Sequence, residues 1–187
     1  MTNIAILASG NGTNAQRIIE YFVGSADINI AVVITNKEDA FVRDRARRFG
    51  IKEVYLSKAD FNNPSKLCQV FYRHRVDWIV LAGFLLLIPK EVINAYNNRI
   101  INIHPALLPK YGGKGMYGMN VHKAVIANKD KHSGITIHYV NEVYDDGKII
   151  FKTKCKVTPD DTPETLAEKI HQLEYEYFPK VIEDLIR

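Results

Sequence analysis

The sequence predicts an α/β fold built on an open, mostly parallel sheet. Over residues 3–83, short apolar segments rich in β-branched residues alternate with amphipathic segments of helical length. Such an alternation is typical of parallel strands buried on both faces. Later, two strand-like segments surround turn residues 141–147, and a long amphipathic segment follows. Together these observations predict a Rossmann-like, doubly wound sheet with a C-terminal β-hairpin and a closing helix.

The individual elements follow from the period of their apolar residues. Strands are predicted where an apolar run is short and continuous, and helices where apolar residues recur every three or four positions. In the first half, the predicted strands are residues 3–9, 28–36, 52–56 and 77–83, and the helices are 13–23, 39–50 and 64–74. In the second half, a short helix begins at Pro89, strands cover 99–103, 134–140 and 148–157, and helices cover 121–129 and 162–185. The last helix is expected to bend before Pro179, because proline removes a backbone donor.

Length and composition predict a single domain over residues 1–187. Hydrophobic residues make up 47% of the chain, charged residues make up 25%, and no apolar run approaches the roughly 18 residues of a membrane helix. The start has no basic segment before its short apolar run, so we expect a cytoplasmic protein. The net charge of +4 is spread along the chain, which argues against nucleic-acid binding.

Neither the cysteines nor the densest basic cluster indicates a binding site. Cys68 and Cys155 are far apart and form no Cys-x-x-Cys motif, so the sequence predicts no disulfide and no metal ion. The basic cluster, residues 43–50, has helical spacing and ends at Gly50. We interpret it as the solvated face of a helix that ends in a glycine cap.

A glycine-containing turn follows the first predicted strand. Gly10 and Gly12 match the G-x-G-x-x-A form of a dinucleotide fingerprint, whose backbone N–H groups close on phosphate. The second strand, however, ends in Thr-Asn at 35–36 and lacks the acidic residue that holds the ribose of NAD. We therefore expect a single phosphate. Thr13 and Asn14 could reach the anion or cap the following helix, and both interpretations stay open.

Asn102, His104 and Asp145 combine an amide, an imidazole and a carboxylate near predicted strand ends. An amide can stabilise an oxyanion, and a histidine moves protons at neutral pH when a carboxylate orients it or holds it charged. These groups suit acyl transfer. No serine or cysteine stands beside His104, so the attacking atom would belong to the substrate. Three further histidines, His122, His132 and His138, are interpreted as taking no part in the chemistry.

An apolar run, residues 84–88, leaves the fourth predicted strand at Gly83. Such a run is more often core than ligand contact, and core is the interpretation that the residues alone favour. The alternative is the wall of a slot for a flat, largely apolar cofactor whose polar edge would meet backbone groups.

Five segments together resemble the glycinamide ribonucleotide transformylases, or phosphoribosylglycinamide formyltransferases, of the formyltetrahydrofolate-dependent superfamily. The segments are "SGNGTNAQRII", "VLAGFLLLIP", "NIHPALLPKY", "GITIHYVNEVYDDGKII" and "ETLAEKIHQLEYEYFP". The resemblance runs in order over nearly the whole chain. It implies transfer of the formyl group of 10-formyltetrahydrofolate, a co-substrate, to the primary amine of glycinamide ribonucleotide. It implies no metal, no nucleic acid and no membrane partner, and it leaves a homodimer open.

The resemblance also implies catalytic roles. Asn102 and His104 would stabilise the tetrahedral oxyanion, while Asp145 would help move the amine proton toward the leaving folate nitrogen.

Binding roles follow from the same resemblance. The phosphate loop falls on Gly12, Thr13 and Asn14, and Glu174 matches a glutamate that meets the glycinamide substrate. The apolar run becomes a wall of the folate slot. The implied folate contacts are Leu85, Leu86, Leu87, Ile88, Asn102, Val140, Asn141, Glu142 and Asp145.

Two departures from the family pattern stand out. Bacterial relatives often carry arginine where this chain has Leu86, so a charge contact to folate would be missing. The loop 111–120 is longer and richer in glycine than the short connection expected there.

Two other functions stay open. A formyltetrahydrofolate hydrolase or a methionyl-tRNA formyltransferase shares the "HP-x-LLP" chemistry, although both normally carry a further domain for which this chain has no spare residues. A non-catalytic nucleotide-binding module would need the glycine turn, but it would have no use for Asn102, His104 and Asp145 together.

Overall fold

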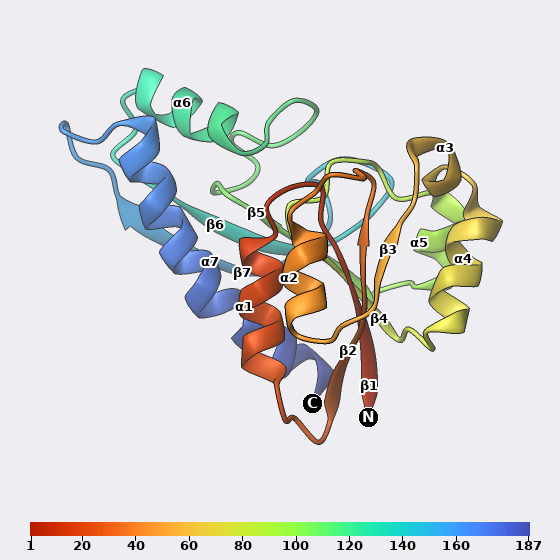
Figure 1. The fold of residues 1–187 in the computed structure, drawn as a ribbon. Helices are drawn as coiled ribbons and strands as arrows, with labels where there is room; N and C mark the ends of the chain where they lie inside the picture. Colours follow the sequence, from red (N-terminus) through yellow and green to blue (C-terminus); the bar gives the residue numbers. More distant parts are fainter.

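Seven strands form one sheet in the order β3-β2-β1-β4-β5-β6-β7 (Figure 1). The computed structural model describes residues 1–187. Strands β1 to β5 pair in parallel, whereas β5 with β6 and β6 with β7 pair antiparallel. The predicted doubly wound sheet with its terminal hairpin is therefore confirmed. The strands are Thr2–Leu7 (β1), Ile28–Thr35 (β2), Glu53–Tyr55 (β3), Trp78–Leu81 (β4), Ile100–His104 (β5), His132–Tyr139 (β6) and Ile149–Lys156 (β7).

Helices cover both faces of this sheet, as its apolar strands require. Helices α1, α2 and α7 bury their apolar residues on one face, with α6 packed against α7, and α3, α4 and α5 cover the other face (Figure 1). None of the helices is long and apolar enough to cross a membrane. The helices are Thr13–Phe22 (α1), Val42–Arg48 (α2), Lys58–Phe61 (α3), Pro64–Arg73 (α4), Lys90–Ala95 (α5), Met119–Ala127 (α6) and Pro163–Ile186 (α7).

Helix α7 is positioned by its first turn and by its buried face. The Thr162 hydroxyl accepts a hydrogen bond from the Thr165 N–H at 3.3 Å, and the Thr165 hydroxyl accepts one from the Thr162 N–H at 2.9 Å. This reciprocal cap satisfies two donors that a helix start otherwise leaves free. The helix continues through the buried Pro179 to Ile186 and packs against α1.

The connection between β6 and β7 folds back along β5. The Val140 N–H donates to the Ile100 carbonyl at 2.9 Å, at the start of β5. Farther along the connection, Asp145 reaches the end of the same strand. Gly147 allows this path, because a Cβ there would overlap the Tyr139 carbonyl.

Candidate active site

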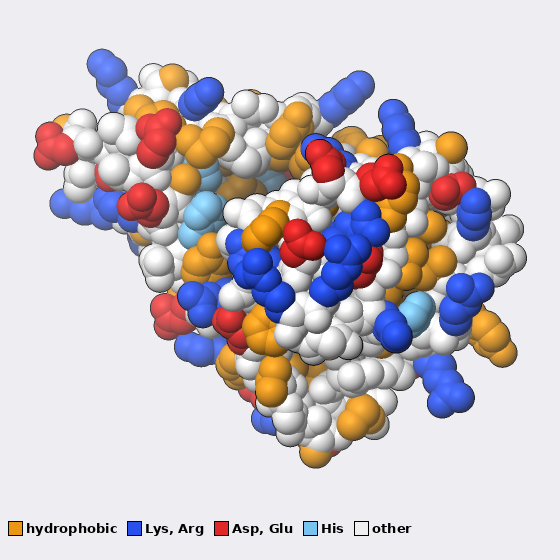
Figure 2. All heavy atoms as spheres, viewed as in Figure 1, with side chains coloured by type: hydrophobic (Ala, Val, Ile, Leu, Met, Phe, Trp, Pro, Cys, Tyr) orange, Lys and Arg blue, Asp and Glu red, His pale blue; other side chains and the backbone are white.

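A cavity of about 650 Å³ lies beyond the carboxyl ends of β1, β4 and β5. The chain reverses its winding between β1 and β4, and such switch points are where open α/β sheets bind ligands. Four segments line the cavity: residues 10–14, 81–88, 102–105 and 113–118, with further residues from 138–145, α6 and α7. In Figure 2, histidine side chains are visible in the hollow between the parts of the molecule that contain α6 and α2.

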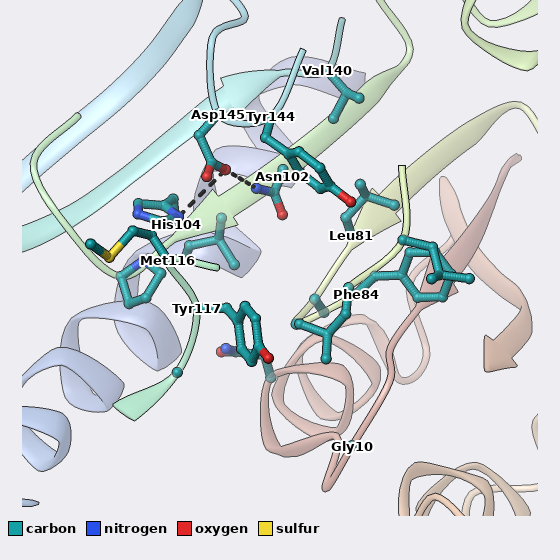
Figure 3. A pocket seen from close by; sticks show the side chains of 18 of the residues that line it. Gly10, Leu81, Phe84, Asn102, His104, Met116, Tyr117, Val140, Tyr144 and Asp145 are labelled. Atoms are coloured by element: carbon teal, nitrogen blue, oxygen red, sulfur yellow. Dashed lines mark hydrogen bonds and ion pairs between the residues drawn. The ribbon is translucent and has the colours of Figure 1, made fainter. Parts of the chain in front are cut away.

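The three catalytic candidates meet in this cavity (Figure 3). Asp145 Oδ1 lies 3.4 Å from His104 Nδ1 and 3.4 Å from Asn102 Nδ2. Asn102 and His104 are two residues apart on β5 and therefore project from the same face of the sheet. The structure thus brings together the amide, the imidazole and the carboxylate that the sequence singled out.

Asp145 is kept ionised by its neighbours. Burial by itself raises the pKa of Asp145, but the contacts with His104 and His138 and the Gly113 N–H, which donates to Oδ2 at 2.9 Å, hold that pKa far below its usual range. The residue has a φ of 55°, a left-handed conformation that aspartate and asparagine adopt more readily than most residues. A fixed negative charge therefore faces the imidazole.

His104 lies between two groups that can only accept hydrogen bonds. Its Nε2 is 2.7 Å from the Tyr111 carbonyl, and its Nδ1 faces the Asp145 carboxylate. Each of these acceptors can receive a hydrogen bond from the ring nitrogen that faces it, so the two contacts fix the orientation of the imidazole next to the cavity.

His138, interpreted from the sequence as uninvolved, lies next to two of these residues. His138 is the cross-strand partner of Asn102, and its Nε2 lies 3.1 Å from Asn102 Nδ2 and 3.7 Å from Asp145 Oδ1. Its Nδ1 lies 2.9 Å from the Tyr139 carbonyl, which can only accept, so Nδ1 carries hydrogen and Nε2 of the neutral ring accepts from Asn102. The only available signal in the sequence was its position on a predicted strand.

The amide nitrogen of Asn102 is thus shared between His138 and Asp145. Its carbonyl oxygen lies on the side away from Asp145 (Figure 3). The contact to Asp145, at 3.4 Å, is longer than the 3.1 Å contact to His138. An incoming oxygen would therefore compete most easily for the N–H that now faces Asp145.

Glu174, on α7, is buried in the lining of the cavity and contacts the phosphate-loop candidate Asn14. Its Oε2 accepts from Asn14 Nδ2 at 2.8 Å, and only 6% of the residue is exposed. Burial raises the pKa of Glu174 to about 7, against smaller lowering effects of Asn14 and His104. The bond to Glu174 also shows that the Asn14 side chain does not cap α1, whose N-cap is Gly12 without a side-chain bond.

The apolar run after β4 is both pocket wall and core. Leu85, Leu86, Leu87 and Ile88 all line the cavity, while Ile88 also belongs to a buried apolar cluster. The interpretation of this run as the wall of a cofactor slot is thus compatible with the structure. The interpretation as core applies to only some of its residues.

One implied folate contact lies outside the lining of the cavity. Val140, Asn141 and Asp145 line the cavity, but Glu142 does not. Its side chain is 52% exposed and forms an ion pair with Lys90 at 3.1 Å, because its place on the connection directs it to solvent.

The glycine-rich loop supplies residues that sequence reasoning did not assign. Lys114, Met116 and Tyr117 line the cavity from this loop, and Figure 3 shows Met116 beside His104. The length of the loop was the only sequence signal. No group of three or more histidine, cysteine, aspartate or glutamate side chains is arranged to hold a metal ion.

Replacing Glu174 by glutamine should stabilise the protein increasingly as pH rises from 5 to 8. Folding raises the pKa of this carboxyl, so the folded protein resists its ionisation. Glu174 therefore lowers the free energy of unfolding once the pH exceeds the pKa of the unfolded chain. This destabilisation grows up to a pH of about 7 and then stays constant. Moving this pKa from 4.5 to about 7 corresponds to roughly 3 kcal/mol at pH 8. Thermal melts of both proteins across this pH range measure the effect.

The matched control is Glu176→Gln, which changes an exposed carboxylate on the same helix. The melting temperature of Glu174→Gln should exceed that of the wild type by roughly 5 °C or more at pH 8, whereas Glu176→Gln should show no such trend. If the difference in melting temperature between Glu174→Gln and the wild type shrank toward pH 8, burial would not raise the pKa of Glu174.

The fold and the site define a class of doubly wound α/β protein that places an amide, an imidazole and a carboxylate beside a glycine-rich turn. The chain belongs to the formyl transferase family, whose model matches residues 2–182. It is 42% identical over 185 residues to the chloroplastic phosphoribosylglycinamide formyltransferase of Arabidopsis thaliana, and the match covers 96% of this chain and 63% of that protein.

Bacterial relatives match over more of their own length. The chain is 35% identical to the phosphoribosylglycinamide formyltransferase of Bacillus subtilis, a match that covers 100% of this chain and 95% of the relative. The crystal structure of glycinamide ribonucleotide transformylase 1 from Geobacillus kaustophilus superposes with a TM-score of 0.90, at 32% identity, and both chains are covered completely.

Proposed function

We propose that the protein transfers the formyl group of 10-formyltetrahydrofolate to the primary amine of glycinamide ribonucleotide. The observation that carries this proposal is a single cavity that joins Asn102, His104 and Asp145 to both a glycine-rich turn and an apolar wall. One reaction in which a phosphorylated amine meets a largely apolar formyl donor uses all three parts. The relatives named above share the "phosphoribosylglycinamide formyltransferase" description.

The two substrates would approach from different sides. The phosphate of the ribonucleotide would lie on the backbone N–H groups of residues 11–13, with Asn14 and Glu174 next along the wall toward the amine. The pterin ring would enter between the apolar run 85–88 and the connection that starts at Val140, where backbone groups can read its polar edge.

The chemistry would then need no enzyme nucleophile. The substrate amine attacks the formyl carbon, forming a C–N bond, and the formyl oxygen becomes an oxyanion that the His104 imidazolium and the Asn102 N–H stabilise. The amine proton leaves toward Asp145 and is delivered to the folate nitrogen N10 as its bond to the formyl carbon breaks. The fixed charge of Asp145 supports both the imidazolium and this proton movement.

Spectrophotometric loss of the formyl group from a 10-formylfolate donor tests this function. Deformylation should be slow with the donor alone and should rise by about two orders of magnitude or more when glycinamide ribonucleotide is added, since the amine fills the attack position. Ribose 5-phosphate, which carries the phosphate but no amine, is the control and should not stimulate the reaction. Equal rates with and without the ribonucleotide would favour the hydrolase alternative.

Some expectations remain predictions of the sequence. They are the single-domain extent of residues 1–187, the cytoplasmic location and the absence of nucleic-acid and membrane partners.

A further inference from the structure

Arg45, on α2, is hydrogen-bonded to the phosphate-loop candidate at three acceptors. Its Nε donates to the Asn11 carbonyl at 2.8 Å, and its Nη2 donates to the Asn11 side-chain oxygen at 2.8 Å. Its Nη1 donates to the side-chain oxygen of Gln16, on the first turns of α1. A planar guanidinium fixes several acceptors in one geometry, so Arg45 holds the turn and the helix that follows it as one unit.

These contacts set the direction of two peptide planes. In a trans peptide, the carbonyl of one residue and the N–H of the next point in opposite directions. The Gly10 carbonyl accepts from the Val42 N–H at 3.2 Å, and the Asn11 carbonyl accepts from Arg45. Both carbonyls therefore point toward α2, and the N–H groups of Asn11 and Gly12 point the other way.

The N–H groups that face away from α2 are free for a ligand. Asn11 and Gly12 line the cavity, and neither of their N–H groups donates to a protein acceptor. Gly12 has a φ of 75°, and a Cβ at this position would overlap the Val42 side chain. Helix α2 therefore packs directly under the turn and leaves its donors exposed on the opposite side, as an anion requires.

Arg45 also differs from Arg43 and Arg47 in charge balance. Arg43 pairs with Glu53 at 2.8 Å, and Arg47 pairs with Asp44 and Glu53 at 3.0 and 2.6 Å. Arg45 has no carboxylate partner, and all its hydrogen-bond acceptors are neutral. Its full positive charge therefore remains beside the turn. The interpretation of residues 43–50 as a purely solvated helix face is thus incomplete.

We propose that Arg45 is a positioning residue that turns the N–H groups of Asn11 and Gly12 toward the substrate phosphate and adds its charge to their field. This inference rests on the proposed function, because it assigns the turn to the phosphate of the ribonucleotide. It predicts an effect on the binding of the phosphorylated substrate and little effect on the formyl donor or on the chemical step.

Three variants separate geometry from charge. Arg45→Gln removes the guanidinium and its charge, while Arg45→Lys keeps the charge but loses the planar set of donors. Arg48→Gln is the matched control: it removes the same charge from the same helix, and Arg48 lies over the Phe41 ring, as Arg45 does, but forms no hydrogen bond to the turn. Steady-state kinetics give kcat and both KM values, and calorimetry with ribose 5-phosphate gives a dissociation constant that does not depend on turnover.

Arg45→Gln should raise the KM for glycinamide ribonucleotide and the Kd for ribose 5-phosphate by about tenfold or more, with kcat and the donor KM within about threefold of wild type. Arg45→Lys should raise the same two constants by at least about threefold, and Arg48→Gln should leave them within about twofold. Melting temperatures of all variants establish that they fold.

Several results would overturn the positioning role: a wild-type KM in Arg45→Lys, an equal effect of Arg48→Gln, or a parallel rise in both KM values. Failure of the proposed function is distinguishable from these results. It would appear as a wild-type protein without ribonucleotide-dependent turnover, while the ribose 5-phosphate titrations of wild type and variants would still test whether Arg45 orients the turn.

Discussion

Replacing Asp145 by asparagine is expected to lower kcat by roughly 100-fold or more in a protein that still folds. Asparagine has the same size and tolerates the φ of 55° at this position, so the backbone and the Gly113 contact can persist. The variant nevertheless loses the charge that faces His104 and, in the proposed mechanism, the carboxylate toward which the amine proton moves. Initial rates with saturating donor and ribonucleotide measure the loss.

Asp146→Asn provides the matched control for this experiment. Asp146 is the next residue on the same connection, is exposed, and contacts Asn141 at 3.2 Å rather than the histidines. It should keep turnover near the wild-type value. If Asp145→Asn instead lowered only the melting temperature and left kcat unchanged, the carboxylate would be a structural part of the turn and not part of the mechanism.

Replacing His104 by alanine is expected to lower kcat by roughly 100-fold or more while leaving folate binding nearly intact. In the proposed mechanism the imidazole stabilises the developing oxyanion, whereas the wall assigned to folate is built from other residues that line the same cavity. Single-turnover rates report the chemical step, and titration with a folate analogue reports binding.

An exposed histidine provides the control for His104→Ala, and the burial of His104 makes a check of folding necessary. His132→Ala removes an exposed histidine from β6 and should leave both measurements unchanged. Because His104 is only 3% exposed, its removal leaves a cavity, so the assays must be run well below the melting temperature of the variant. A variant that keeps more than about half of wild-type turnover would remove His104 from the mechanism.

Elements with local signals could be predicted from the order of the residues alone. Continuous apolar runs and amphipathic spacing predicted the strands and every helix except the single turn α3, because side-chain period is a property of the chain before it folds. The shared orientation of Asn102 and His104 was also predictable from the local sequence, since residues two apart on a strand project from the same face. The glycine turn before α1 could be predicted because only a few residues adopt its backbone conformation.

The contacts of these residues depend on the three-dimensional fold. His138 meets Asn102 because β6 pairs with β5 in one particular antiparallel register, and a shift of one residue would place it on the other face. Glu174 becomes a buried acid through the packing of α7 on α1. Arg45 differs from its neighbouring arginines only in the acceptors that the fold brings to it. Register, burial and partner choice arise from contacts between segments distant in sequence, which the local pattern of side chains does not encode.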